Sequence, residues 1–339
     1  MSKQRYNAAI QRAKGLLELA SGLYDTSLSH RTKRAAEGVL QTDSRLGYHV
    51  KLSLSPRGGQ SDSVSLSFAA DSFREIKLLA EGKISVAWIN PSASVTLAYR
   101  GTGPLGRPIP LRIIAVFPSW DLIGFAVHES TGIASLAQIG KERIPINLST
   151  GPAGKRALLG SPVTFAVHSV LQAAGFTIAD IRKWGGKIQE VSRPSDPVRR
   201  AAIEKGTIDA IFDEGIKSWG QSALDRGFRY LPVDGAVLRR VKAMGYRAGV
   251  APKSRFKGMR HDIPTVDFSG WPMVVRADMP NDVAYALCEA IEARRKVMPT
   301  DNFKPLSIAQ LCANDEEAPY EVPIHPGARR FYRERGYLK

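Results

Sequence analysis

Two stretches of the sequence, LLAEGKISVAWINPS (residues 78–92) and AAIEKGTIDAIFDEG (residues 201–215), follow the same pattern. Each starts as a helical segment, turns at a glycine and continues as an apolar run of strand length that ends on polar residues. Helices that alternate with such strands are typical of α/β folds with largely parallel sheets. The sequence therefore predicts an α/β fold.

The alternation of helical and strand patterns extends over most of the chain and is interrupted near residue 120. It contains more units than one small sheet can hold, and 339 residues suffice for two domains of ordinary size. Two α/β lobes are the economical interpretation. Lobe 1 is discontinuous and comprises residues 1–121 and 266–339, and lobe 2 comprises residues 122–265.

A third stretch, STGPAGKRALLGSP at residues 149–162, has the composition of a phosphate-binding loop and follows the apolar segment RIPINL. A nucleotide P-loop requires a glycine, four further residues and then Gly-Lys-Ser/Thr. When Gly154 and Lys155 are aligned with that motif, Ser149 takes the place of the first glycine and Arg156 that of the hydroxyl residue. The pattern argues against a P-loop and leaves a hydroxyl-rich loop between a strand and a helix.

The composition is that of a basic globular protein. Apolar residues make up 43% and charged residues 24%, and no segment approaches the ~20 apolar residues of a membrane-spanning helix. The net charge of +16 is dispersed, which indicates a generally basic surface rather than a nucleic-acid interface. The sequence shows no export signal, so a cytoplasmic location is predicted as it is written. A periplasmic location is the alternative if a signal peptide was removed.

Neither a metal nor a cofactor is predicted. The six histidines are scattered, and no His-x-x-x-His or Cys-x-x-Cys pair occurs. Cys288 and Cys312 could form a disulfide, although nothing in their spacing requires one.

Three later segments carry a resemblance to a known family: LPVDGAVLRRVKAMGY (231–246), DIPTVDFSGWPMVVRADMP (262–280) and HPGARRFYRERGY (325–337). Their order resembles that of the solute receptors of TRAP transporters of the TAXI branch, from roughly residue 66 to the C-terminus. The resemblance implies a type II periplasmic-binding-protein fold, in which two α/β lobes face a central cleft and are joined by two hinge crossings.

The resemblance also implies a function. It predicts a solute-binding protein that captures a small organic anion, of the carboxylate type, by hinge closure, and a TRAP-type permease as a membrane partner. Helix N-termini in such a cleft carry unpaired N–H groups and a partial positive charge, which suit a carboxylate. The hydroxyl-rich loop then becomes the anion loop of lobe 2. Its candidate ligand-binding residues are Ser149, Thr150, Ser161 and Thr164, and helix capping is the alternative role for each.

By the same matching, further candidates follow the predicted strands of both lobes. Ser72 lies where the family has a glycine-rich hydroxyl loop, a pattern from which this sequence departs. Asn90 and Asp213 come at strand ends, and Trp271 lies where the chain should recross between the lobes. Tyr24 is a weaker match to a ligand-contacting loop, because the chain begins with a predicted helix over residues 3–20 where the family has a strand, and a second helix is predicted over residues 31–41.

An enzyme on the same scaffold, a decarboxylase or dehydratase of a small organic acid, is the alternative hypothesis. Its acid or base could be Asp213, Glu214, His168 or Asp267. No nucleophile–base–acid arrangement follows from the spacing, so no catalytic residue is assigned.

Overall fold

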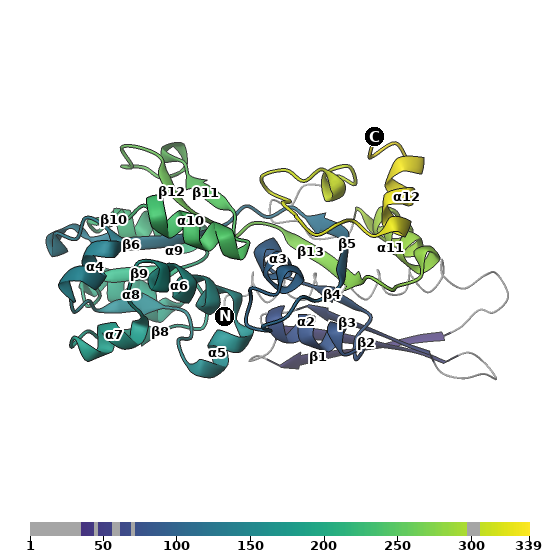
Figure 1. Cartoon of the computed structure of the whole chain (residues 1–339), viewed down its shortest axis with the longest axis horizontal. Coiled ribbons are helices and arrows are strands. Elements are labelled where there is room, and N and C mark those ends of the chain that lie inside the picture. The colour runs from purple at the N-terminus through teal and green to yellow at the C-terminus, as the bar shows by residue number, and fades with distance from the viewer. Residues whose placement is uncertain (1–34, 44–46, 56–61, 69–71, 297–305) are drawn as a thin grey trace. The chain divides into compact units, whose positions relative to one another are not determined.

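The computed structural model describes residues 35–43, 47–55, 62–68, 72–296 and 306–339. These residues form two compact units (Figure 1). Unit 1 takes its described residues from 1–101, 107–120 and 269–339, and unit 2 consists of residues 102–106 and 121–268. Tyr24 and the helix predicted over residues 3–20 lie outside the described residues.

Unit 1 is built on a six-stranded sheet with the order β1-β2-β3-β4-β13-β5. Its three N-terminal strands pair antiparallel, β3 and β4 run parallel, and β13 is antiparallel to both of its neighbours, β4 and β5. The strands are β1 (Ala35–Asp43), β2 (Gly47–Ser55), β3 (Asp62–Phe68), β4 (Val86–Trp88), β5 (Leu111–Phe117) and β13 (Trp271–Arg276).

Helices cover the sheet of unit 1. Figure 1 shows α11 and α12 beside each other next to β5, and their apolar faces share one core in which Ile114, Leu287 and Phe331 are buried. The Tyr332 hydroxyl donates to the Ile114 carbonyl at 2.9 Å, which fixes α12 on the sheet. The helices are α2 (Ser72–Ala80), α3 (Ser92–Arg100), α11 (Asn281–Arg294), η3 (Gln310–Cys312) and α12 (Pro326–Glu334).

Unit 2 is built on a seven-stranded sheet with the order β11-β12-β6-β9-β7-β8, and β10 pairs with β6 beside this path. The strands β8, β7 and β9 run parallel, and β6 is antiparallel to β9. The strands are β6 (Leu122–His128), β7 (Leu148–Thr150), β8 (Ile188–Glu190), β9 (Ala210–Asp213), β10 (Phe228–Tyr230), β11 (Ala248–Ala251) and β12 (Ile263–Asp267).

Four helices of unit 2, namely α4, α6, α7 and α8, begin at side-chain caps. Thr177 and Asp180 form a capping box at α7, and Pro162 occupies the first turn of α6, where its missing N–H costs no hydrogen bond. The helical elements are η1 (Glu129–Thr131), α4 (Leu136–Glu142), α5 (Lys155–Gly160), α6 (Pro162–Ala173), α7 (Ile178–Lys183), α8 (Pro197–Lys205), α9 (Ile216–Leu224), α10 (Gly235–Met244) and η2 (Lys253–Arg255).

In each unit, one antiparallel strand of the sheet begins where the chain has just crossed over from the other unit. In unit 2 this strand is β6, which starts just after Trp120, and in unit 1 it is β13, which starts just after Phe268. The sheet of unit 1 therefore combines strands from two separate stretches of the chain, whereas all seven strands of the unit 2 sheet lie within residues 121–268. The predicted α/β class is confirmed, with mixed rather than purely parallel sheets.

Most local predictions agree with the structure, and one is wrong. The stretches at residues 78–92 and 201–215 form α2–β4 and α8–β9, each with its turn glycine at positive φ, Gly82 and Gly206. The helix predicted over residues 31–41 is contradicted, because residues 35–43 form β1 and pair antiparallel along the whole of β2. Antiparallel pairing with β2, the next strand in the sequence, overrides local helix preference there.

A close approach between α12 and α11 gives a first prediction. A Cβ at Gly327 would overlap the Asn281 carbonyl oxygen and lie 2.8 Å from the carbonyl carbon, and backbone cannot move aside cheaply. We expect Gly327→Ala to destabilise unit 1 by about 1–3 kcal/mol, measured by thermal unfolding. Gly154→Ala, where an added Cβ meets nothing within 4 Å, is the control. Equal effects of the two substitutions would contradict the prediction.

Candidate functional site

The polar candidates of unit 2 gather at one edge of its sheet. Because β7 and β9 are parallel, their carboxyl ends lie at the same edge, with Thr150 paired to Phe212 and Ser149 to Ile211. Asp213 is the last residue of β9 and lies at that edge too. The space outside the carboxyl ends of parallel strands is where α/β sheets commonly bind ligands.

A buried arginine from α8 connects these strand ends. Arg199 is 1% exposed; its Nε donates to the Ser149 hydroxyl at 3.0 Å, its Nη1 donates to the Pro194 carbonyl at 3.1 Å, and its Nη2 forms an ion pair with Asp213. The structure thus brings Ser149 and Asp213 together, through a residue that sequence reasoning did not single out. A signal existed, because Arg199 occupies the same helical face as the buried Ala202 and Ile203.

The Asp213 carboxylate is buried, and it accepts from the Arg199 guanidinium on Oδ2 and from the Glu214 N–H on Oδ1. Burial raises its pKa, while the Arg199 guanidinium and the Glu214 N–H, which donates to Oδ1 at 2.8 Å, act in the opposite direction. An arginine keeps its proton at any ordinary pH, so the pair is ionic and structural. Asp213 therefore has its charge satisfied within the protein.

The neighbouring Glu214 has a different environment. Its side chain is half-buried, and no hydrogen bond or ion pair to its carboxyl group occurs among the described residues. Burial is the main cause that raises its pKa well above the usual value, and the carboxylates of Asp121 and Asp213 add to the effect. Asp121 itself accepts the Gly215 N–H at 3.1 Å, which holds this carboxylate at the same turn.

The hydroxyls of the predicted anion loop are largely occupied by the protein itself. Thr150 donates to the Phe212 carbonyl at 2.7 Å, and Thr164 donates to the Pro152 carbonyl and approaches the Ser161 hydroxyl at 3.1 Å. Ser161 accepts the Thr164 N–H and caps α6. These bonds correspond to the capping role that the sequence left open, and ligand contact by the four hydroxyls stays a prediction.

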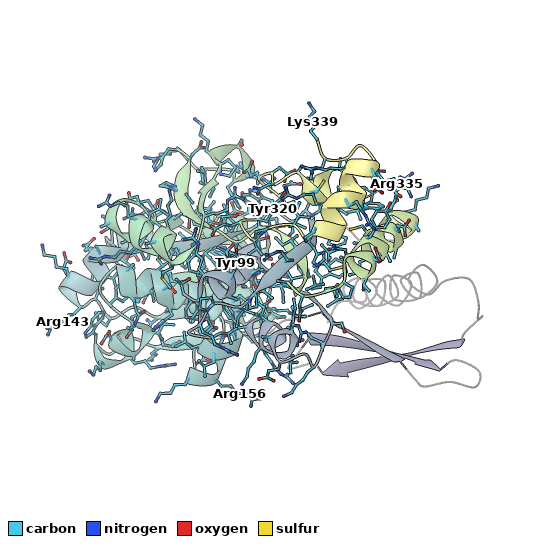
Figure 2. The ribbon with its side chains drawn as sticks, turned by 45° about the vertical axis from the view of Figure 1, so that its right-hand side comes forward. Tyr99, Arg143, Arg156, Tyr320, Arg335 and Lys339 are labelled. Atoms are coloured by element: carbon cyan, nitrogen blue, oxygen red, sulfur yellow. The ribbon has the colours of Figure 1, made fainter. Side chains whose placement is uncertain are left out.

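The Val163 N–H at the start of α6 has no acceptor among the described residues. The Ser161 hydroxyl lies 3.1 Å from Thr164 Oγ1 and can donate its proton to that oxygen, because the single Thr164 proton goes to the Pro152 carbonyl. A Cβ at Gly151 would lie 3.4 Å from Val163 Cγ1 and 3.7 Å from Asp213 Oδ1, at ordinary van der Waals contact, so Gly151 lies beside both the start of α6 and the end of β9. In the same loop, Arg156 on α5 is exposed and extends away from the ribbon (Figure 2).

The unit 1 candidates form a second, separate cluster around the end of β4. The Ser72 hydroxyl donates to the Asn90 carbonyl at 2.6 Å and accepts the Asn90 N–H at 3.1 Å, so the structure does bring these two together. The Asn90–Pro91 peptide is cis, and α3 begins directly after it. The Trp271 carbonyl accepts the Trp88 indole N–H at 3.0 Å, which ties β13 to β4.

Ser92, which sequence reasoning missed, lies in this second cluster. Its N–H donates to the Gly270 carbonyl at 3.1 Å, while its buried hydroxyl has no partner among the described residues. Gly270 has φ +81°, and a Cβ there would overlap the Ser92 hydroxyl. Glycine is therefore required at this turn between β12 and β13.

The remaining acid–base candidates show no shared site. His168 lies on α6, where burial lowers its pKa, and Asp267 lies 3.9 Å from Arg247 at the end of β12. Within the described residues, no group of three His, Cys, Asp or Glu side chains could hold a metal ion, and no helix is long and apolar enough to cross a membrane. Cys288 and Cys312 are both buried free thiols, so the disulfide is not formed.

The described residues form two α/β units, each built on a mixed sheet. The model of the NMT1-like family matches residues 57–336, and the chain belongs to this family. The narrower TAXI assignment stays a prediction.

Several solved structures are similar to the chain at low identity. One is the alkanesulfonate-binding protein SsuA from Xanthomonas axonopodis pv. citri bound to MOPS, with 13% identity, 80% of this chain and 82% of that chain covered, and a TM-score of 0.31. A TctC solute binding protein from Polaromonas is 13% identical, with 74% of this chain and 75% of that chain covered and a TM-score of 0.34. PhnD1 from Prochlorococcus marinus in complex with methylphosphonate is 11% identical, with 79% of this chain and 84% of that chain covered and a TM-score of 0.37.

The ion pair of Arg199 gives a second prediction. Removing one partner of a buried pair leaves an uncompensated charge, so Arg199→Met should destabilise unit 2 by about 3–5 kcal/mol, and Arg199→Met with Asp213→Leu should recover part of that loss. Urea unfolding measures both effects. Arg200→Met, at an exposed position of the same helix, is the control and should change stability by less than about 0.5 kcal/mol. A double variant no more stable than Arg199→Met would contradict this account.

Glu214 gives a third prediction, on pH dependence. Its folded-state pKa lies above the unfolded value of 4.5, so the folded protein holds this proton more tightly. The contribution of Glu214 to stability therefore falls as the pH rises above about 4.5, and the penalty is complete above the folded pKa. Glu214→Gln should be more stable than the parent at pH 8, by a margin that shrinks toward pH 4. Melting temperatures across this range test it, with the exposed Glu204→Gln as control, and a margin independent of pH would refute it.

Proposed function

We propose that the chain is a solute-binding protein that captures a small organic anion, of the carboxylate type, at the carboxyl edge of the unit 2 sheet. The observation that carries the proposal is the Val163 N–H at the start of α6, which has no acceptor among the described residues, with the Ser161 hydroxyl beside it, whose proton can turn from Thr164 Oγ1 to a ligand. The 12-residue helix adds the positive end of its dipole at this point. An anionic oxygen could accept from both donors without a cationic side chain.

The charges around this position limit which anion can bind. Arg199 is neutralised by Asp213, and the Asp121 carboxylate is held at the neighbouring turn by the Gly215 N–H. The raised pKa of Glu214 favours its neutral form, which does not repel an anion and can donate a hydrogen bond to one. A compact anion with one charged group fits this balance better than a polyanion, because Asp121 and Asp213 already place two acidic residues beside Glu214 at this edge.

The wider elements of the hypothesis stay predictions. Ser149, Thr150, Thr164 and Asp213 would support the anion-binding turn through their internal bonds, rather than touch the solute. Ser72, Asn90 and Trp271 of unit 1 are proposed as further solute contacts. Closure of lobe 1 (residues 1–121 and 266–339) on lobe 2 (residues 122–265), and a TRAP-type permease as partner, follow from the sequence resemblance alone.

An enzyme on the same scaffold, a decarboxylase or dehydratase of a small organic acid, is the second candidate function. The observation that favours it is Glu214, a half-buried carboxyl group with a raised pKa and no hydrogen bond or ion pair to it among the described residues. Such a group holds its proton more tightly than an exposed glutamate does and could serve as a general acid. Mass spectrometry of a bound acid after incubation separates the two, because a binding protein returns it unchanged and an enzyme returns a product lacking CO₂ or water.

The binding proposal is tested first by a ligand screen at pH 7. Pyruvate, lactate, butyrate and benzoate, each with one carboxylate, are compared with the neutral butyramide by thermal shift, and any hit is titrated calorimetrically. A saturable ligand that binds the folded state raises the melting temperature. We expect at least one carboxylate to do so and butyramide not to. Shifts that are absent for all acids, or equal for acid and amide, would refute the carboxylate proposal.

The fourth prediction locates the bound anion at α6. Ser161→Ala removes both a cap and a proposed ligand donor, so it should cost about 1 kcal/mol of stability and about 10- to 150-fold in affinity for the carboxylate found by the screen. Thr177→Ala removes the equivalent cap of α7 and is the matched control, with a similar loss of stability and unchanged affinity. If Ser161→Ala binds as tightly as Thr177→Ala, the hydroxyl only caps the helix.

A further inference from the structure

Unit 2 contains a pocket that the proposed solute site does not use. Its volume is about 470 Å³, within the range of about 300–1,000 Å³ that small-molecule sites occupy. It lies among η1, α9, β10, the segment of residues 257–261 and the start of β12. Its larger lining side chains are Glu129, Leu224, Phe228, Arg229, Tyr230, Lys257, Met259, Arg260, His261 and Ile263.

The pocket lies at the opposite edge of the sheet from Asp213. β6 runs antiparallel to β9, with Gly124 opposite Asp213 and Val127 opposite Ala210. Glu129 follows the carboxyl end of β6 and therefore lies toward the amino end of β9. A ligand in this pocket would contact neither Ser161 nor Glu214, so the inference is independent of the proposed function.

The lining of the pocket is strongly basic. Arg229, Lys257 and Arg260 contribute cationic side chains, and Glu129 is the one acidic residue among the described lining residues. None of the three cations forms an ion pair within the described part of the chain. The Arg229 guanidinium donates to the Ile133 carbonyl, so a neutral acceptor holds it in place without cancelling its charge.

The basic wall is anchored to the body of unit 2. The Lys257 N–H donates to the Gln221 side chain at 2.8 Å, and the Gln221 amide donates back to the Lys257 carbonyl at 3.2 Å. Phe256 is buried, and its ring lies 5.8 Å from that of Tyr230. These contacts fix the backbone from which Lys257 and Arg260 extend, so both cations project from a loop that is held in place by hydrogen bonds and packing.

The pocket also has apolar walls. Leu224, Phe228, Met259 and Ile263 supply apolar surface. Tyr230 lines the same pocket, but its hydroxyl is buried against Gly220 of α9 and is not exposed to a ligand there. The apolar walls therefore face a ligand body rather than its charged group.

We propose that this pocket binds an amphipathic organic anion, with a sulfonate, phosphate or carboxylate group beside Arg229, Lys257 and Arg260 and an apolar or aromatic body against Phe228, Met259 and Ile263. Guanidinium groups recognise such oxyanions through paired N–H donors. The pocket volume accommodates one aromatic ring system with its charged group, rather than a polymer.

The test uses 8-anilino-1-naphthalenesulfonate, a fluorescent amphipathic anion of this class, titrated into the full chain at low salt. We expect a saturable increase in dye fluorescence that fits one binding site and depends on the residues of the pocket. The exposed pair Lys257→Gln with Arg260→Gln, and separately Arg229→Gln, should each weaken binding by about tenfold or more. Glu129→Gln should tighten it, because it removes the opposing charge. The control, Arg239→Gln, takes the same charge from the exposed face of α10 and should change nothing.

The controls distinguish an unfolded variant, a wrong pocket assignment and a general polyanion-binding surface. Melting temperatures confirm that each variant is folded, and the exposed double variant answers the question if Arg229→Gln unfolds. Unchanged dye affinity in that double variant overturns the proposal, as does displacement of the dye by a single-stranded 12-nucleotide DNA, which would indicate a polyanion surface. Ser161→Ala should leave dye binding unchanged, so failure of the pocket proposal and failure of the solute proposal are distinguishable.

Discussion

The buried ion pair between Arg199 and Asp213 is the constraint on which the carboxyl edge of unit 2 depends. Through one guanidinium group, α8 is joined to the end of β9, to Ser149 on β7 and to the Pro194 carbonyl before the helix. The charged groups are almost wholly shielded from water, so each needs the other to remain buried at acceptable cost. The pair fixes the edge from which the following turn, residues 213–215, extends.

The same edge shows how a polar loop can be mostly structural and still leave a place for a ligand. Thr150 and Thr164 direct their protons to backbone carbonyls, which holds the loop after β7 in one shape. The Val163 N–H then remains without an acceptor among the described residues, next to the Ser161 hydroxyl at the start of α6. Rigid support by satisfied hydroxyls and recognition by unsatisfied donors are complementary roles, because a loop that must reorganise on binding loses affinity.

Unit 2 presents opposite electrostatic characters at the two edges of one sheet. Asp121, Asp213 and Glu214 gather at the carboxyl edge around a single buried arginine, whereas Arg229, Lys257 and Arg260 gather at the other edge without a paired acid in the described chain. The net charge of +16 does not reveal this difference, because it is a sum over the whole chain and does not say where each charge lies. Where a charge lies in the fold decides which ligand it can attract.

The sequence by itself determined the class of fold and most of its elements. Apolar runs bounded by glycine located β4 and β9, and the cap signal before Pro162 located α6, because hydrophobic periodicity and capping are local properties. The strand β1 could not be found in this way, since its pairing with β2 is a property of two segments. Only the tertiary structure decided that Arg199 meets Asp213, that the loop hydroxyls are internally bonded, and that a basic pocket opens beside β10. Each of these depends on segments distant in sequence that become neighbours only when the sheet assembles.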